Sequence, residues 1–194
     1  AMPVTIELNM YALLISLVIA IPLGILSALR KNSILDYSTS IGSAIGIAIP
    51  NFWFSLMLIV IFSLMLGWLP PFGLRSWKGY IMPVIVLATE QMAVLTRVMR
   101  SSTVEVLTDD YVRTAHAKGL HRYTVIMRHA VRNALLPMVT VLGLRIAFLL
   151  SGTIVVETIF ALPGIGRLFT DSVFRLDYQV VQSLVVVFAV LVVV

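Results

Sequence analysis

The sequence predicts an all-α, polytopic helical membrane protein with about five transmembrane helices. Of its 194 residues, 60% are hydrophobic and only 12% are charged, and the mean hydropathy is +1.03. Ordinary soluble domains carry about twice that share of charge. Long apolar stretches rich in Leu, Ile, Val and Met follow one another without alternation of polar and apolar residues, which favours membrane helices over the strands of a barrel.

A helix needs about 20 residues to cross the hydrocarbon core of a bilayer. The predicted spans are Met10–Leu29, Ile41–Leu66, Tyr80–Leu95, Ala134–Val156 and Val180–Val194. Pro50 should bend the second span, because proline lacks an amide N–H and its ring clashes with the preceding turn. The last span reaches the end of the sequence, so we expect the chain to be a fragment.

The distribution of basic residues predicts the orientation of the spans. The connectors after the first and third spans hold nine of them: Arg30, Lys31, Arg97, Arg100, Arg113, Lys118, Arg122, Arg128 and Arg132. The opposite connectors hold four: Arg75, Lys78, Arg167 and Arg175. Because cytoplasmic loops are enriched in Lys and Arg, the first group should be cytoplasmic. This orientation puts residue 1 outside, so we also expect a further helix upstream.

One hydrophilic segment, residues 107–133, separates the third span from the fourth. Thr108 is a favourable N-cap, acids follow it in the first turn, and Lys118-Gly119 suit a helix C-terminus. We expect a helix of about three turns, a reversal at Gly119 that a Cβ would oppose, and a second helix capped by Thr124. A short exposed helix between two spans suits docking to another protein, and a solvated connector is the alternative.

Several motifs, in order along almost the whole chain, resemble one family of membrane proteins. They are TIEL at 5–8, IPNFW at 49–53, YVRTAHAKGL at 111–120, RHAVRNALLP at 128–137 and VETIFALPGIGRL at 156–168. Together they are similar to the permeases of binding-protein-dependent ABC importers of the dipeptide, oligopeptide and nickel type. The chain resembles the first of the two permeases that such systems pair.

The resemblance is incomplete in the hydrophilic segment. The general importer pattern begins with Glu-Ala-Ala where this chain has Arg113-Thr114-Ala115, so only Ala115 and Gly119 match it strictly. The peptide-type subfamily commonly shows the version found here, so the difference favours that subfamily over the other importer permeases. Contacts known from sugar or amino-acid importers do not carry over residue by residue.

The resemblance implies that residues 1–194 form a single transmembrane permease domain of a bacterial or archaeal inner membrane. It implies partners in the bilayer and in solution: ATP-binding subunits, a second and non-identical permease, and an extracytoplasmic binding protein, with no nucleic acid. The substrate would be a peptide or a related small solute such as nickel. The residues expected to couple the chain to the ATP-binding subunits are Tyr111, Arg113, Thr114, Ala115, Lys118, Gly119 and Leu120.

Two further groups of residues are candidates for function. Glu90 and Arg145 lie inside predicted spans, where an isolated charge costs at least about 2.5 kcal/mol, so they should pair with each other or line the translocation path. The external loop contains Glu157, Pro163, Gly164 and Gly166. It resembles the family's re-entrant loop that meets the binding protein, and an ordinary Pro-Gly turn is the alternative.

Other classes of function are less consistent with the sequence. We expect no cofactor or metal, because the chain has no Cys, and His116, His121 and His129 lack the i, i+4 spacing of helical ligands. It also lacks a Walker-type nucleotide loop, so ATP hydrolysis should belong to partner subunits. A self-contained secondary transporter or channel would show internal repeats or paired membrane acids. An intramembrane enzyme would need catalytic pairs that the spans do not contain.

Overall fold

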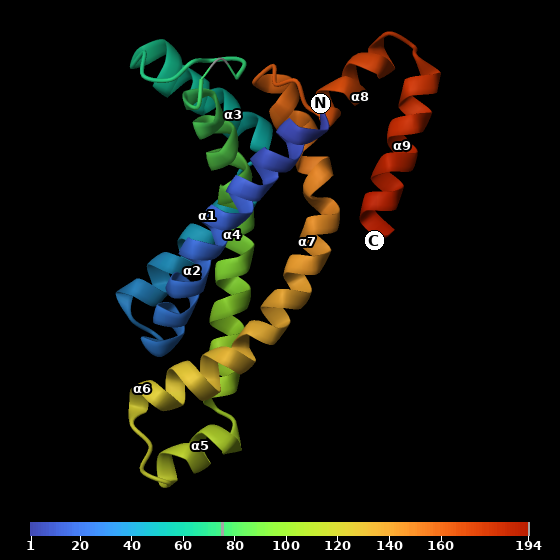
Figure 1. Ribbon diagram of the computed structural model, residues 1–194. Helices are drawn as coiled ribbons and strands as arrows, with labels where there is room; N and C mark the ends of the chain where they lie inside the picture. Colours follow the sequence, from blue (N-terminus) through green and yellow to red (C-terminus); the bar gives the residue numbers. More distant parts are fainter. Residues whose placement is uncertain (75, 194) are drawn as a thin grey trace. The chain divides into compact units, whose positions relative to one another are not determined.

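The computed structural model describes residues 1–74 and 76–193, and every regular element in this part of the chain is helical (Figure 1). Arg75 and Val194, which the topology count and the last predicted span included, lie outside the described residues. The helices are α1 (Met2–Leu29), α2 (Ile34–Ala48), α3 (Asn51–Leu58), α4 (Lys78–Leu107), α5 (Asp110–Ala117), α6 (Arg122–Thr124), α7 (Arg132–Ile159), α8 (Ile165–Phe174) and α9 (Tyr178–Val193), with π-helical turns η1 (Ile59–Met65) and η2 (Val125–Val131).

Three helical segments are long and apolar enough to cross a membrane: α1, α4 and the stretch Val125–Arg145. A fourth span results if α2 and the α3–η1 helix are counted together, and α9 contributes a shorter apolar helix, Tyr178–Val190. The prediction of a polytopic all-helical membrane protein is confirmed. In place of five uninterrupted spans, the described residues form three, a broken pair and a shorter helix.

The predicted bend at Pro50 is confirmed, because the helices on its two sides are bent by 98°. The second span differs from the prediction in being broken at Pro50, where a single continuous helix was expected. Helix α2 ends at Ala48 and α3 begins at Asn51, while Pro50 is extended with φ −67° and ψ 134°. A proline also disfavours helical geometry in the residue before it, so the break comes just ahead of the ring. By contrast, Pro22, Pro83 and Pro137 lie inside helices α1, α4 and α7.

Helix α4 is longer than predicted. Hydropathy ended the third span at Leu95, but the helix continues to Leu107 and carries Arg97 and Arg100 on its last turns. Nothing between Pro83 and Leu107 is a Pro or a Gly, so the backbone has no local reason to stop where the apolar character ends. The hydrophilic connector is therefore shorter than the basic residues suggested.

The described chain forms two compact units. The first contains Ala1–Ile15, Ala48–Gln91 and Leu144–Val194, and the second contains Ser16–Ile47 and Met92–Gly143. Each has its own apolar core. Leu8, Met82, Val86, Val156 and Phe160 belong to the core of the first unit. The core of the second unit includes Ala20, Leu95, Met99, Ala134 and Met138.

Candidate functional site

Helix α5 is the short exposed helix that the hydrophilic segment predicted. Its first backbone bond runs from the Val112 N–H to the Asp109 carbonyl at 3.1 Å, and its last helical residue is Ala117. At its end the Leu120 N–H bonds the Ala115 carbonyl at 3.4 Å, and Gly119 has φ +74°. This is the six-to-one bond of a Schellman motif with glycine at the left-handed position. A Cβ on Gly119 would meet no atom within 4 Å, so the backbone angle, and not crowding, favours glycine there.

Both predicted N-caps in this segment are wrong. The Thr108 hydroxyl donates backwards to the Glu105 carbonyl at 2.7 Å, so Thr108 closes the end of α4. Thr124 is itself helical, with φ −63° and ψ −43°, and makes no capping bond. The following helix begins after His121, whose Nδ1 accepts the Tyr123 N–H at 3.3 Å. Each helix boundary lies one to three residues from the expected cap, because the chain offers several polar side chains that can do the same work.

One face of α5 is buried inside the protein. Val112 and Ala115 are 2% and 7% exposed and pack against the fully buried Val125, with Val106 beside them. The Asn133 side-chain amide also donates to the Tyr111 hydroxyl at 2.8 Å, which ties α5 to α7. Ala115, one of the two strict matches to the importer pattern, is therefore an internal packing residue.

The remaining coupling candidates point outwards. We define the coupling face as Tyr111, Arg113, Thr114, Lys118 and Leu120, all of which are exposed. Arg113 and Asp110 form an ion pair at 3.5 Å, but their side chains are 80% and 96% exposed. Such a pair adds little to stability, so both charges are free to engage a partner. The side chain of His116 lies outside the described part of the structure.

Glu90 and Arg145 meet, and a third polar side chain joins them. The Arg145 guanidinium donates to Glu90 Oε1 at 2.9 Å, and the Asn51 amide donates to Glu90 Oε2 at 3.0 Å. The side chains of Arg145 and Glu90 are 32% and 37% exposed. The trio is thus internally paired and still accessible. Asn51 follows the Pro50 break directly, which is why its side chain can reach the acid.

The carboxylate of Glu157 organises the loop between α7 and α8. Glu157 is fully buried; its Oε1 accepts the Thr5 hydroxyl at 2.5 Å and its Oε2 accepts the Arg167 N–H at 3.1 Å. The Thr5 oxygen in turn accepts the Ile165 N–H at 2.9 Å. Two amides in the first turn of α8 therefore bond to side chains from outside that helix, one of them on α1, 160 residues away. Anionic groups are favoured at a helix N-terminus.

Two glycines make room for this carboxylate. A Cβ on Gly164 would overlap the carboxyl group of Glu157, and a Cβ on Gly166 would collide with the backbone of Ile154. Gly164 has an ordinary extended backbone, φ −96° and ψ 179°, so space alone requires glycine. Pro163 is exposed and precedes the site. The two glycines of the motif PGIG are thus required by the lack of space around the buried Glu157 side chain and its helix. The sequence alone did not show this reason.

A buried polar row continues from Glu157 along the same two helices. Asn9 is 7% exposed and donates to the fully buried Thr153 hydroxyl at 3.0 Å. Thr5 and Asn9 are four residues apart on α1, and Thr153 and Glu157 are four apart on α7, so each pair occupies one helix face. This row was not predicted from the sequence. The feature that could have revealed it is a pair of polar residues with helical spacing at the edge of each of the two apolar stretches.

A second buried acid, in the other unit, was also missed. Asp36 is 2% exposed and bonds the Ser27 hydroxyl and the Arg100 Nε, each at 2.5 Å, and the Arg100 Nη2 at 2.8 Å. The Asn32 N–H completes the set at 3.0 Å. Sequence reasoning used Arg100 only as a marker of topology, and the structure shows that its guanidinium is bound by Asp36. Asp36 is the only acid in the sequence between the first two predicted spans, and this isolation could have indicated that it has a basic partner.

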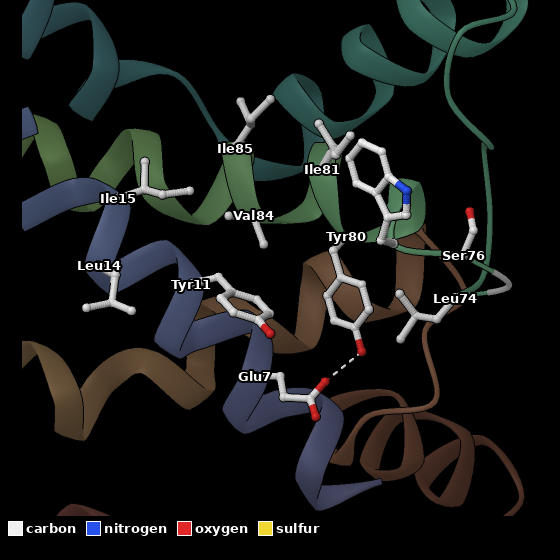
Figure 2. Close-up of a pocket in the computed structure, with 11 residues that line it drawn as sticks. Glu7, Tyr11, Leu14, Ile15, Leu74, Ser76, Tyr80, Ile81, Val84 and Ile85 are labelled. Carbon is white, nitrogen blue, oxygen red and sulfur yellow. Dashed lines mark hydrogen bonds between the residues drawn. The ribbon is translucent and has the colours of Figure 1, made fainter. Parts of the chain in front are cut away.

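A pocket of about 860 Å³ in the first unit also escaped sequence analysis. It lies between α1, the start of α4 and the loop before α4 (Figure 2). Its polar end contains Glu7, whose carboxylate accepts the Tyr80 hydroxyl at 2.7 Å. No group of three or more His, Cys, Asp or Glu side chains that could hold a metal occurs among the described residues.

Known permeases are similar to this chain over almost its whole length. The oligopeptide transport system permease protein AppB of Bacillus subtilis (strain 168) is 46% identical over 203 residues, which cover 100% of this chain and 64% of that protein. The dipeptide transport system permease protein DppB of the same organism is 42% identical, covering 99% of this chain and 62% of that protein. The glutathione transport system permease protein GsiC of Escherichia coli (strain K12) is 40% identical, covering 95% and 60%.

The chain therefore spans less than two thirds of the length of these curated relatives. A family model also matches residues 20–194, which include all of the α5 segment and the Glu157 loop. The resemblance found in the motifs is confirmed, and this chain belongs to the family of binding-protein-dependent transport system inner membrane components.

Proposed function

We propose that the protein is a permease subunit of an ATP-driven importer and forms part of a translocation path for peptides or a related small solute. The family and the permease names of its relatives support this class. The proposed partners are separate ATP-binding subunits, a second permease and an extracytoplasmic binding protein. The proposed location is a bacterial or archaeal inner membrane, with residues 107–133 in the cytoplasm and 158–179 outside.

Helix α5 is the observation that carries the proposal. It presents the coupling face to solvent between two long apolar helices and is braced from behind by Ala115, Val125 and the bond between Asn133 and Tyr111. A stiff braced element can transmit the movement of a docked partner, whereas a flexible connector would absorb it. ATP-driven closure of the partner subunits would in this way reach the spans.

The Glu90 trio is our candidate for a path-lining site. A polar group in a span usually faces the protein interior or an aqueous path, and these side chains remain about one third exposed. Their mutual pairing lowers the cost of placing them in the spans, while their exposed fraction leaves hydrogen-bonding capacity for a passing polar solute. The pair and the path-lining role are therefore compatible.

The loop at α8 is our candidate contact for the binding protein. Its backbone is held by Glu157 and by the Arg167 guanidinium, which donates to the Ala161 carbonyl at 2.7 Å. Pro163 and Leu168 stay exposed on this rigid frame. A preformed surface loses little conformational entropy when it binds.

The coupling proposal is tested in the full-length permease expressed with its partner subunits. Lys118→Glu with Arg113→Glu should reduce co-purification of the ATP-binding subunits and abolish uptake, while the permease still inserts into the membrane. Lys31→Glu is the matched control, because Lys31 is an exposed base outside α5. Normal uptake and normal co-purification by the double variant would refute the role of α5. Uptake without any ATP-binding subunit would favour a secondary transporter.

A further inference from the structure

The pocket at Glu7 has two chemically different ends. Glu7, Tyr11 and Tyr80 lie together at one end, where Tyr11 and Tyr80 make an edge-to-face contact with ring centroids 6.0 Å apart. Figure 2 shows the Glu7 carboxylate turned towards the Tyr80 hydroxyl with Tyr11 beside them, and Leu14 and Ile15 farther along α1. Val84 and Ile85 line the facing side on α4. The cavity is therefore polar and aromatic at one end and purely aliphatic at the other.

The polar end carries an acid without a cationic partner. Among the residues that the structure describes, Glu7 is the only charged side chain that lines the pocket, and it forms no ion pair with a Lys or Arg of that part of the chain. The Tyr80 hydroxyl occupies one lone pair of Oε2, so the carboxylate keeps further acceptor sites. A ligand that fits this end brings a cation with N–H donors.

The depth and position of the pocket indicate an amphiphile. Leu14 follows Glu7 by seven residues, which is about 10 Å along a helix, and both belong to a helix long and apolar enough to span a membrane. Tyr and Trp side chains mark the level of lipid head groups, and three of them, Tyr11, Trp77 and Tyr80, line this pocket. Leu14, Ile15 and Ile85 are 51%, 43% and 40% exposed. The aliphatic end is thus open along its length, as an acyl chain requires.

We propose that this pocket binds a membrane lipid whose head group carries a primary ammonium, such as phosphatidylethanolamine. The ammonium donates hydrogen bonds to Glu7, and one acyl chain lies along Leu14, Val84 and Ile85. Lys78 follows Trp77 at the start of α4 and is exposed, which suits the lipid phosphate. A short peptide fits less well, because its carboxylate would fall at the aliphatic end, where none of the described lining residues is basic.

The experiment uses the full-length permease purified with its partner subunits. The complex is incubated with equal amounts of phosphatidylethanolamine, phosphatidylcholine and phosphatidylglycerol of identical acyl chains, and the retained lipids are counted by native mass spectrometry. Phosphatidylethanolamine should be retained about tenfold over phosphatidylcholine, as expected for hydrogen bonds to a charged group. The trimethylated ammonium of phosphatidylcholine has no N–H to donate.

Three variants connect the retained lipid to the pocket. Glu7→Gln should reduce the preference to within about twofold, and Tyr80→Phe, which keeps the acid but frees its orientation, should give an intermediate value. Glu105→Gln is the matched control, because Glu105 is an exposed acid on α4 outside the pocket. It should retain the wild-type preference. Co-purification of the partner subunits shows that each variant is folded.

Several results would overturn the proposal. Equal retention of the three lipids, or a preference that survives Glu7→Gln, would show that Glu7 does not bind a lipid ammonium. Displacement of phosphatidylethanolamine by trialanine, lost in Glu7→Gln, would identify the occupant as a peptide ammonium. Crosslinking of the Leu14→Cys variant to another subunit would show that protein covers the pocket.

Discussion

Helices α5 and α7 end with the same hydrogen-bond pattern, but different residues occupy the turn. In α5 the Leu120 N–H bonds the Ala115 carbonyl across Gly119, and in α7 the Leu162 N–H bonds the Glu157 carbonyl at 2.8 Å across Ala161. Gly119 has φ +74° and Ala161 has φ +52°. An L-residue with a Cβ is disfavoured in this left-handed region, so the α7 terminus holds a strained residue where the α5 terminus does not.

The difference shows how local preference and tertiary context share the task of ending a helix. The α5 terminus is exposed, with open space around Gly119, so the residue itself must favour the turn. The α7 terminus is held from outside: the Arg167 guanidinium bonds the Ala161 carbonyl, and Leu162 is fully buried. These contacts offset the strain at Ala161. Glycine appears instead at 164 and 166, where space is scarce.

The largest effect should come from filling that space. Gly164→Ala places a methyl group on the Glu157 carboxyl, so either the acid or the start of α8 must move. We expect loss of most folded protein in detergent, measured by size-exclusion yield of the full-length permease. Gly42→Ala is the control, because a Cβ there meets nothing within 4 Å. Comparable yields for the two variants would show that the loop adapts to the added methyl group.

The next effect compares the loss of one acid near each helix end. Glu157→Gln turns an amide N–H₂ group towards N–H and O–H groups that donate hydrogen bonds to the carboxylate. Each buried donor left unsatisfied costs about 1–3 kcal/mol. The apparent melting temperature should fall. Asp110→Asn, on the exposed α5 surface, should leave it unchanged. If both variants melt alike, the Glu157 network does not stabilise the loop.

The side chains of Glu90 and Arg145 are more exposed than Glu157 and less exposed than Asp110. Changes at this pair should therefore have an intermediate effect on stability. If the pair contributes to folding, Glu90→Gln or Arg145→Met leaves one charge without its partner, so the double variant should be less damaged than at least one single variant. The measurements are melting temperature and substrate uptake. Strictly additive losses in melting temperature would mean that the charges do not interact. Losses confined to uptake would favour the path-lining role.

The smallest effect is a reciprocal exchange at the two helix ends. Gly119→Ala should destabilise α5, and Ala161→Gly should relieve strain at the end of α7, each by about 1 kcal/mol or less. Opposite shifts in melting temperature would establish that the two turns share one geometry. A loss at both positions would mean that the partly buried methyl group of Ala161 contributes more through packing than it costs in backbone strain.

Local signals in the sequence predicted part of the candidate site well. Hydropathy located the membrane helices, because the bilayer demands long apolar runs, and Gly119 marked the end of α5, because its backbone angle is a local property. The caps at Thr108 and Thr124 were wrong, since neighbouring polar side chains compete for the same amides. The end of α4 was also missed, because loss of apolar character does not end a helix.

By itself, the sequence determined the helical membrane class, the family, the exposed α5 segment and the reversal at Gly119, because each depends on composition or on residues close together in the chain. Only the tertiary structure decided that Glu157 bonds Thr5, that Arg100 is committed to Asp36, and that Ala115 faces inwards. These contacts join residues as many as 152 positions apart. A buried acid requires hydrogen-bond partners, but that requirement does not specify which distant helix supplies them.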